Sequence, residues 1–277
     1  MKTNLLICAA LVLANLSAVA APLTESTFTE IIHDVNTLST AGNPTAAKLQ
    51  DILKAPDRVR TGPDSRAELT APDNTVTRVG ANTVFSFSDS GRTLNLEQGN
   101  LLFHAPKGLG GGTIKSGGAS AAVLGTTLTV SATADGGFKV ILLEGKGKVT
   151  SSKGKSVTLK AGQMIYVLPG GTQFSKIINI NLDRLVAGSL LVKGFDHPLA
   201  SAPLIDSAIK KQKSLIATGG TTDTGEATGN GLNAVDHGSY QTASSTPLTK
   251  DQYQFISTSS IGGGAGGRNL STLSFAP

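Results

Sequence analysis

The chain has 277 residues, of which 39% are hydrophobic and 16% are charged, and its formal net charge is +5. This balance is typical of a globular protein of one or two domains and excludes a chain that is disordered throughout. There is no Trp and aromatic residues make up 4% of the chain, so we expect a core of Val, Leu, Ile and Ala. Without aromatic platforms for stacking bases, nucleic acid is not an expected partner.

Residues 1–20 have the features of a secretory signal peptide. Lys2 supplies a positive start, residues 5–16 are almost entirely apolar, and Ala18-Val19-Ala20 fits the small-x-small cleavage rule, so we expect cleavage between Ala20 and Ala21. A permanent anchor is the alternative, but the apolar run is shorter than the roughly 20 residues that a membrane-spanning helix needs. We therefore expect a periplasmic or extracellular protein with no transmembrane segment after signal cleavage.

Export also explains the cysteine content. Cys8 is the only Cys in the chain and lies inside the apolar run, where too little apolar length precedes it for a lipoprotein signal. The mature chain then has no thiol, which excludes a disulfide framework and a thiolate metal site.

Residues 24–38 fit two kinds of secondary structure. Phe28, Ile31 and Val35 have helical spacing, with Thr27 and Glu30 placed as a capping box, but alternate residues of the same segment also form one strand face. Periodicity leaves helix and strand both open here. Residues 47–53 are equally consistent with a short helix or a strand.

Residues 61–168 predict an all-β body. Short runs place apolar residues two apart, which gives each run one apolar face. The runs contain Phe85 and Phe87, Leu94 and Leu96, Leu101 and Phe103, Val140 and Leu142, Val157 and Leu159, and Ile165 and Val167. Turns such as Asp89-Ser90-Gly91 and Asp135-Gly136-Gly137 separate them. Residues 107–118 contain six glycines and predict a long loop.

One local device recurs in this body. Leu96-Glu97-Gln98-Gly99, Leu143-Glu144-Gly145 and Leu159-Lys160-Ala161-Gly162 each end an apolar run at a Gly. We predict that a strand ends at each Gly, which takes a backbone angle that a Cβ would penalise, and that the chain then enters a new strand. Gly125 is expected to make a similar bend.

Several blocks of the sequence resemble, in family order, those of the FecR domain. They are residues 61–69, 73–83, 94–101, 123–130, 142–149 and 159–163. The resemblance implies a periplasmic module of the kind found in iron-transport regulators and other exported proteins. It implies a twisted β-solenoid-like stack of short strands in which each layer covers the apolar face of its neighbour. It also implies that residues 28–38 are strand and belong to the same domain.

Composition changes after Leu168. Residues 181–193 and 203–216 predict two helices, and Lys210, Lys211 and Lys213 lie near the end of the second, where positive charge suits the helix dipole. Residues 218–277 are rich in Gly, Ser and Thr and predict disorder. The expected organisation is a signal peptide at 1–20, an all-β FecR-like domain at 21–175, a helical extension at 176–217 and a disordered tail at 218–277.

No catalytic, cofactor-binding or metal-ligating residue is predicted. The four histidines lack metal-ligand spacing, and Gly154-Lys155-Ser156 lacks the upstream Gly of a phosphate loop. Ser207 and Lys210 have nucleophile spacing without its partner motifs. Arg58, Arg60, Arg66 and Arg78 accompany the acids Asp57, Asp64 and Glu68, which predicts cross-strand charge pairs.

Five lysines cluster within one predicted hairpin and its exit: Lys146, Lys148, Lys153, Lys155 and Lys160. They can contact an anionic glycan, lipopolysaccharide or an acidic protein. Alternatively, they protect a sheet edge from pairing with other chains.

Three functions follow from these features. The first is a non-enzymatic exported binding or sensing module, with an envelope protein or polysaccharide as its partner. The second is a structural envelope or matrix component that binds anionic polysaccharide. The third is a glycan-acting enzyme, with Glu97 and Glu144 aligned in the stack. In FecR regulators a cytoplasmic anti-sigma segment and a membrane helix precede the periplasmic domain. Only residues 1–4 precede the apolar run here, so sigma-factor regulation is not expected.

Overall fold

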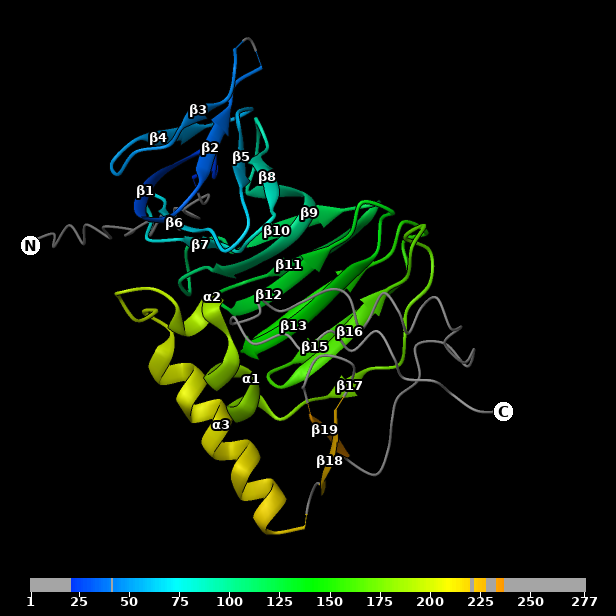
Figure 1. Ribbon diagram of the computed structural model, residues 1–277. Helices are drawn as coiled ribbons and strands as arrows, with labels where there is room; N and C mark the ends of the chain where they lie inside the picture. Colours follow the sequence, from blue (N-terminus) through cyan, green and yellow to red (C-terminus); the bar gives the residue numbers. More distant parts are fainter. Residues whose placement is uncertain (1–20, 41, 220–221, 228–232, 237–277) are drawn as a thin grey trace, which may run out of the picture.

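In this computed structural model the described residues are 21–40 and 42–219, with the backbone of β18 (Thr222–Ala227) and β19 (Asn233–Asp236). Strands β1 to β17 belong to one 17-stranded sheet, which folds over into two facing layers, and helices α1 to α3 lie together on one side of the strands (Figure 1). The predicted all-β body with a small helical extension is confirmed.

The strands divide into two layers by their pairing. In spatial order, sheet A contains β4 (Ile52–Lys54), β1 (Glu25–Ile32), β6 (Arg66–Thr70), β7 (Val76–Val79), the second half of β9 (Thr93–His104), β12 (Thr127–Ala132), β13 (Phe138–Glu144), β16 (Gln163–Val167) and β17 (Ile178–Asn179). Sheet B contains β3 (Thr45–Ala46), β2 (Val35–Leu38), β5 (Arg58–Thr61), β8 (Val84–Phe87), the first half of β9, β10 (Gly112–Ser116), β11 (Ala119–Val123), β14 (Lys146–Thr150) and β15 (Ser156–Lys160).

Strand β9 belongs to both layers. Its first half pairs with β8 and β10 in sheet B, and its second half pairs with β7 and β12 in sheet A. After His104 the chain returns to sheet B, so β10 runs parallel to the start of β9. This segment makes one complete coil. Elsewhere the chain reverses direction between neighbouring strands, because the remaining pairings among the described strands are antiparallel.

The chain passes between the layers at two corners. The first corner, at the Gly99 end of β12, joins β1 to β2, β5 to β6, β7 to β8 and the two halves of β9. The second corner, at the Thr127 end, joins β11 to β12, β13 to β14 and β15 to β16. Residues with positive φ occupy these bends: His33, Asp64, Asn82 and Gly99 at the first corner, and Gly125, Gly145 and Gly162 at the second. The predicted bends at Gly99, Gly125, Gly145 and Gly162 are confirmed, but β9 continues through Gly99 instead of ending there.

Threonine hydroxyls link successive layers at the corners. Thr61 Oγ1 donates to the Gly80 carbonyl over 2.6 Å and accepts from the Thr83 amide over 2.9 Å. Thr83 Oγ1 in turn accepts from the Asn100 amide over 2.9 Å. These bonds supply partners for backbone groups that leave the sheet ladders at a bend.

The main core lies between the two sheets. Each strand turns its alternate apolar residues inward, and Phe85 and Phe87 of β8 meet edge to face with ring centroids 5.5 Å apart. The arrangement confirms the predicted stack, in which each layer covers the apolar face of its neighbour.

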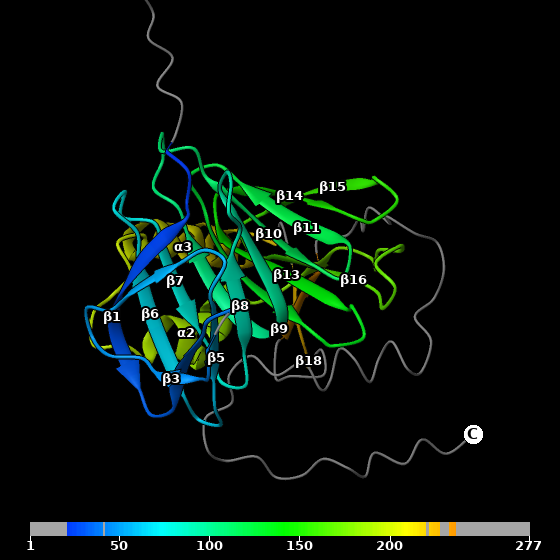
Figure 2. The same ribbon diagram turned by 90° about the horizontal axis from the view of Figure 1, so that it is seen from above.

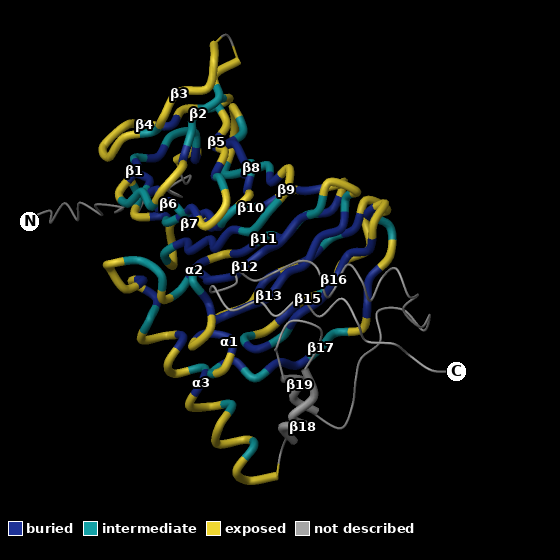
Figure 3. The backbone as a smooth tube through the Cα atoms, in the orientation of Figure 1, coloured by how far each residue is buried: buried dark blue, intermediate teal, exposed yellow. Residues whose placement is uncertain are grey.

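A second apolar cluster covers the outer face of sheet A. It joins Leu102, Ile141, Leu143, Met164 and Tyr166 to residues of α1 (Leu182–Gly188), α2 (Leu190–Lys193) and α3 (Ala202–Ala217). Strands β12 and β13 are therefore buried on both faces (Figure 3). Both predicted helices are confirmed, although the first is interrupted at Ser189.

Three segments resolve or correct the sequence predictions. Residues 24–38 are strands β1 and β2, as the family resemblance implied, with a bend at His33. The predicted loop at 107–118 contains β10, which two neighbouring strands hold although Ile114 is its main apolar residue. Most of the tail predicted to be disordered lies outside the described residues, and within it β18 and β19 pair.

The predicted cross-strand charge pairing is present at Arg78, whose Nε lies 2.8 Å from Oε2 of Glu68 in a buried pair. Arg58 pairs with Glu97, an acid outside the predicted set. Arg78 also donates to the carbonyls of Leu191, Val192 and His197 and lies over the Phe195 ring. The side chain thus joins sheet A to the end of α2.

Candidate functional site

The second half of the sheet carries a strong excess of positive charge. Residues 98–182 include nine lysines, which are Lys107, Lys115, Lys139, Lys146, Lys148, Lys153, Lys155, Lys160 and Lys176. The same segment has two acids, Asp135 and Glu144, and Glu144 is buried. Because a one-sided excess of charge attracts ligands of opposite sign, this half favours anionic partners.

Six of these lysines form what we call the lysine face: Lys115, Lys146, Lys148 and Lys160 point outward from strands of sheet B, and Lys153 and Lys155 lie in the hairpin that joins β14 to β15. All six are exposed, and none has an ion pair with a described residue. Lys146 lies opposite Lys160 in the pairing of β14 with β15. Neighbouring strands are about 4.8 Å apart, and alternate residues of one strand about 7 Å apart, so the charges form a closely spaced array.

Hydroxyl groups fill the positions between the lysines. Thr150 of β14 lies between Ser120 of β11 and Ser156 of β15, and Lys148 lies beside Thr158. Short side chains on a sheet leave a flat surface of donors and charges. Such a surface suits an extended anionic polymer.

The structure brings together the five lysines predicted from the sequence. Lys146 and Lys148 point outward from β14, and Lys153 and Lys155 lie in the hairpin before β15. Among the described strands β15 pairs with β14 alone, so it is an edge strand of sheet B (Figure 2). Edge protection and partner binding therefore both remain compatible with this cluster. Lys115 was missed because it lies in the segment predicted to be a loop.

The predicted signal cleavage site lies at the boundary of the described residues. Ala20 is outside them. The carbonyl of Ala21 accepts a hydrogen bond from Arg92 Nη1 over 2.8 Å, and Leu23 is already buried in the core.

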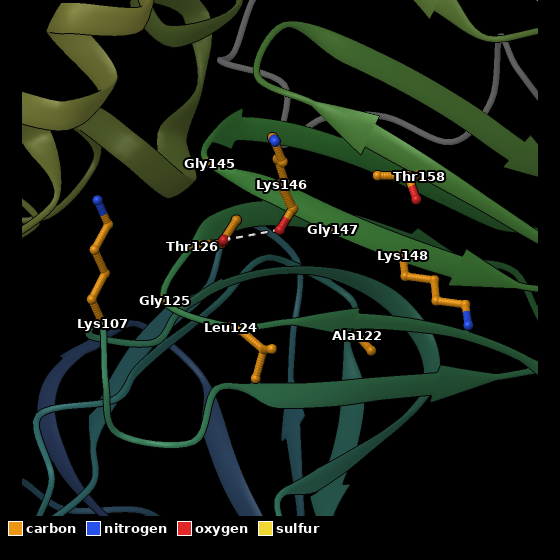
Figure 4. Close-up of a pocket in the computed structure, with 10 residues that line it drawn as sticks. All are labelled: Lys107, Ala122, Leu124, Gly125, Thr126, Gly145, Lys146, Gly147, Lys148 and Thr158. Carbon is orange, nitrogen blue, oxygen red and sulfur yellow. Dashed lines mark hydrogen bonds between the residues drawn. The ribbon is translucent and has the colours of Figure 1, made fainter.

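A pocket of about 420 Å³ opens at the second corner beside the lysine face (Figure 4). Its lining contains Leu124, Ala122 and three lysines, Lys107, Lys146 and Lys148. Leu124 is 80% exposed. No acidic residue lines this pocket, which combines the apolar side chains of Leu124 and Ala122 with three lysines.

A buried hydrogen-bonded group underlies the same corner. The Thr127 hydroxyl donates to Glu144 Oε1 over 3.0 Å, and His104 Nδ1 lies 3.0 Å from Thr127 Oγ1. Burial raises the pKa of the Glu144 carboxyl, while the hydrogen bond from Thr127 and the charge of Lys107 oppose that rise. Burial lowers the pKa of His104. The Thr127 side chain is fully buried, so the group links β9, β12 and β13 rather than facing a ligand.

The predicted alignment of Glu97 with Glu144 is wrong. Glu97 lies near the first corner on sheet B, where it pairs with Arg58 at 3.3 Å, and Glu144 lies at the second corner. The two bends are at opposite ends of β12, because Gly99 pairs with Ala132 and Glu144 pairs with Thr127. These two acids cannot flank one bond of a substrate.

Among the described residues, no cluster of three or more His, Cys, Asp or Glu is arranged to hold a metal ion. No helix in this part of the chain has both the length and the apolar character needed to cross a bilayer.

Part of the chain is similar to known proteins. Two crystal structures of a "putative anti-sigma factor from Parabacteroides distasonis ATCC 8503" are similar, each with 20% identity and a TM-score of 0.38. Each match covers 42% of this chain and 57% of that chain, so little more than half of the other protein is matched. No curated protein sequence matches. Residues 57–149, from just before β5 to β14, match the family model for the FecR protein, and the chain therefore contains a FecR domain.

Proposed function

We propose that this chain is an exported, non-enzymatic FecR-like module that binds or senses an anionic partner in the bacterial envelope. The observation that carries the proposal is the lysine face, where six exposed lysines lie without described acidic partners on sheet B, whose outer face no described helix covers. Helices cover the outer face of sheet A, which leaves sheet B as the broad β surface available to a partner.

Export is supported by the first 20 residues, which have the positive start, apolar run and small-x-small site of a signal peptide. The FecR resemblance also implies a role in the envelope.

The partner is an acidic protein or an anionic polysaccharide. The flat alternation of lysines with Ser120, Thr150 and Ser156 supports the polysaccharide, because extended sugar polymers need hydroxyl partners as well as charge. If the partner is a polysaccharide, the chain would act as a structural component of the envelope or matrix, which is the alternative function.

The test is a pull-down from bacterial envelope extract, with the chain immobilised and washed at about 0.05 M and about 0.5 M salt. A Lys115→Gln, Lys153→Gln, Lys155→Gln variant removes three charges from the lysine face. A Lys48→Gln, Lys54→Gln, Lys193→Gln variant removes three lysine charges elsewhere and serves as the control.

We expect the first variant, but not the control, to lose the partner that the wild type retains at low salt. Release at high salt as a mixture of acidic polysaccharide would favour the structural role, and retention of one defined protein would favour sensing. If the lysine-face variant and the control capture the same material equally, the proposal fails.

A further inference from the structure

Two leucines project from the second corner. Leu124 is 80% exposed and Leu109 is 41% exposed, the former being the most exposed large apolar side chain among the described residues. They belong to adjoining segments, since a Cβ added to Gly111 would lie 2.9 Å from the Cα of Leu124. Exposed leucine costs free energy in water, so burial of Leu124 and Leu109 against an apolar partner would be favourable.

Lysines lie beside this apolar tip. Lys107, Lys146 and Lys148 line the same pocket as Leu124, and Figure 4 shows them to the left of, above and to the right of Leu124. The backbone holds the arrangement in place, because the Lys146 carbonyl accepts from Thr126 Oγ1 over 3.0 Å and Gly125 packs on Lys107. Lys160, opposite Lys146 on β15, extends the ring of charge.

We propose that the second corner docks on an anionic phospholipid surface. Leu124 and Leu109 enter the boundary between headgroups and acyl chains, and Lys107, Lys146 and Lys148 contact lipid phosphates. The proposal goes beyond the binding of a soluble anionic partner by the lysine face, although the two surfaces share Lys146 and Lys148.

A lipid surface fits this corner better than a polymer does. A hydrophilic polysaccharide offers no apolar surface to bury Leu124, which is 80% exposed. The interface of an anionic membrane can bury the leucine and also attract the lysines beside it. Lysine stems reach along apolar surface while the ammonium group stays at the polar level, so the ring can lie at headgroup height around the buried tip. Among the residues that line the pocket, none is acidic, which removes repulsion from lipid phosphates.

The test measures co-sedimentation of the chain starting at Ala21, which keeps every described residue, with vesicles of phosphatidylglycerol and phosphatidylcholine or of phosphatidylcholine alone. We expect partitioning to the anionic vesicles only. Leu124→Ser should reduce it about tenfold, from the lost burial of one leucine. Lys146→Gln with Lys148→Gln should reduce it about 25-fold, or about fivefold for each lysine.

Matched controls come from the first half of the chain. Leu49→Ser removes a leucine that is 60% exposed, and Lys48→Gln with Lys54→Gln removes two exposed lysines. Both should leave partitioning unchanged. Circular dichroism of each variant checks that the β structure is retained.

Equal binding to neutral vesicles, no binding to anionic vesicles, or an unchanged Leu124→Ser variant would overturn the docking proposal. A soluble polyanion such as heparin separates it from the proposed function. Leu124→Ser should keep heparin binding while losing vesicles. If the wild type binds heparin but not vesicles, the docking proposal fails and the proposed function stands. If it binds vesicles but not heparin, the soluble-polyanion role fails and docking stands.

Discussion

Arg78 lies directly opposite Glu68 in the pairing of β6 with β7, and its Nε donates to Glu68 Oε2 over 2.8 Å. The guanidinium is fully buried, so the charge is matched inside the protein rather than by water. Its Nη1 group donates to the carbonyls of Leu191 and Val192, and its Nη2 group donates to the carbonyl of His197. One side chain therefore neutralises an acid and supplies partners for a helix end.

Arg78→Met should lower the free energy of unfolding by about 3–5 kcal/mol, because it leaves the Glu68 carboxylate buried without its partner. Three carbonyl groups also lose a donor. Urea denaturation followed by circular dichroism measures the change. Arg60→Met, at an exposed position of β5, is the control and should change stability by less than about 0.5 kcal/mol. Equal effects of the two substitutions would contradict the buried role of Arg78.

Gly99→Ala should be far more damaging than Gly91→Ala. Both glycines have positive φ, +95° and +71°, so alanine carries a backbone penalty of about 1 kcal/mol or more at either position. At Gly99 the new Cβ would also lie 2.5 Å from the Cα of Thr83, while at Gly91 it would meet nothing within 4 Å. Thermal unfolding of the two variants measures the difference. Similar midpoints would show that the corner has room for a side chain.

Glu144→Gln should change how stability depends on pH. Burial raises the pKa of Glu144, so between its unfolded and folded values the native state binds more protons than the unfolded state. The contribution of Glu144 to stability therefore falls as pH rises from about 4.5 through the folded value. Glutamine keeps an oxygen that accepts from Thr127 but does not titrate.

Urea titrations from pH 4 to pH 8 test this prediction. Glu144→Gln should gain stability relative to the wild type as pH rises, and Glu97→Gln, at an exposed acid, should not gain in this way. Parallel wild-type and Glu144→Gln curves across the range would mean that the carboxyl ionises in the folded protein as easily as in the unfolded chain.

Lys139→Met should remove a pH dependence on the alkaline side. Burial lowers the pKa of Lys139 to about 7, from 10.5. Between these values the unfolded chain binds the proton and the native state releases it, so wild-type stability should rise with pH, by at most about 1.4 kcal/mol per unit. The free energy of unfolding measured from pH 6.5 to pH 10 checks this, and a wild type that parallels Lys139→Met would contradict it.

The bends were predictable because their cause is local. At Gly99, Gly145 and Gly162 an apolar run ends at a residue without a Cβ, and positive φ follows from that chemistry alone. The spacing of Phe85 and Phe87 likewise indicates which face is buried. The secondary structure of residues 24–38 could not be decided from their periodicity. Their apolar residues fit one face of a helix and one face of a strand, and the pairing of β1 with β6, which decides for a strand, involves a distant segment.

The remaining features depend on partners distant in the sequence. Alternation places Arg78 on the outer face of β7, but it is buried by α2, whose residues follow more than a hundred positions later. β10 is held by pairing rather than by its own composition. Leu124 continues the alternation of β11, in which Ala119, Ala121 and Val123 are buried, so it points outward just before the bend at Gly125.

The double membership of β9 has a consequence for synthesis of the protein. Its first half has a partner, β8, that emerges from the ribosome earlier, and its second half has β7. Its other neighbours, β10 and β12, are translated later. A nascent chain that ends near residue 104 therefore has two unpaired strand edges, one on each half of β9. Unpaired strand edges can pair with other chains. The strand that unites the finished molecule is thus the one whose incomplete pairing exposes a nascent chain to aggregation.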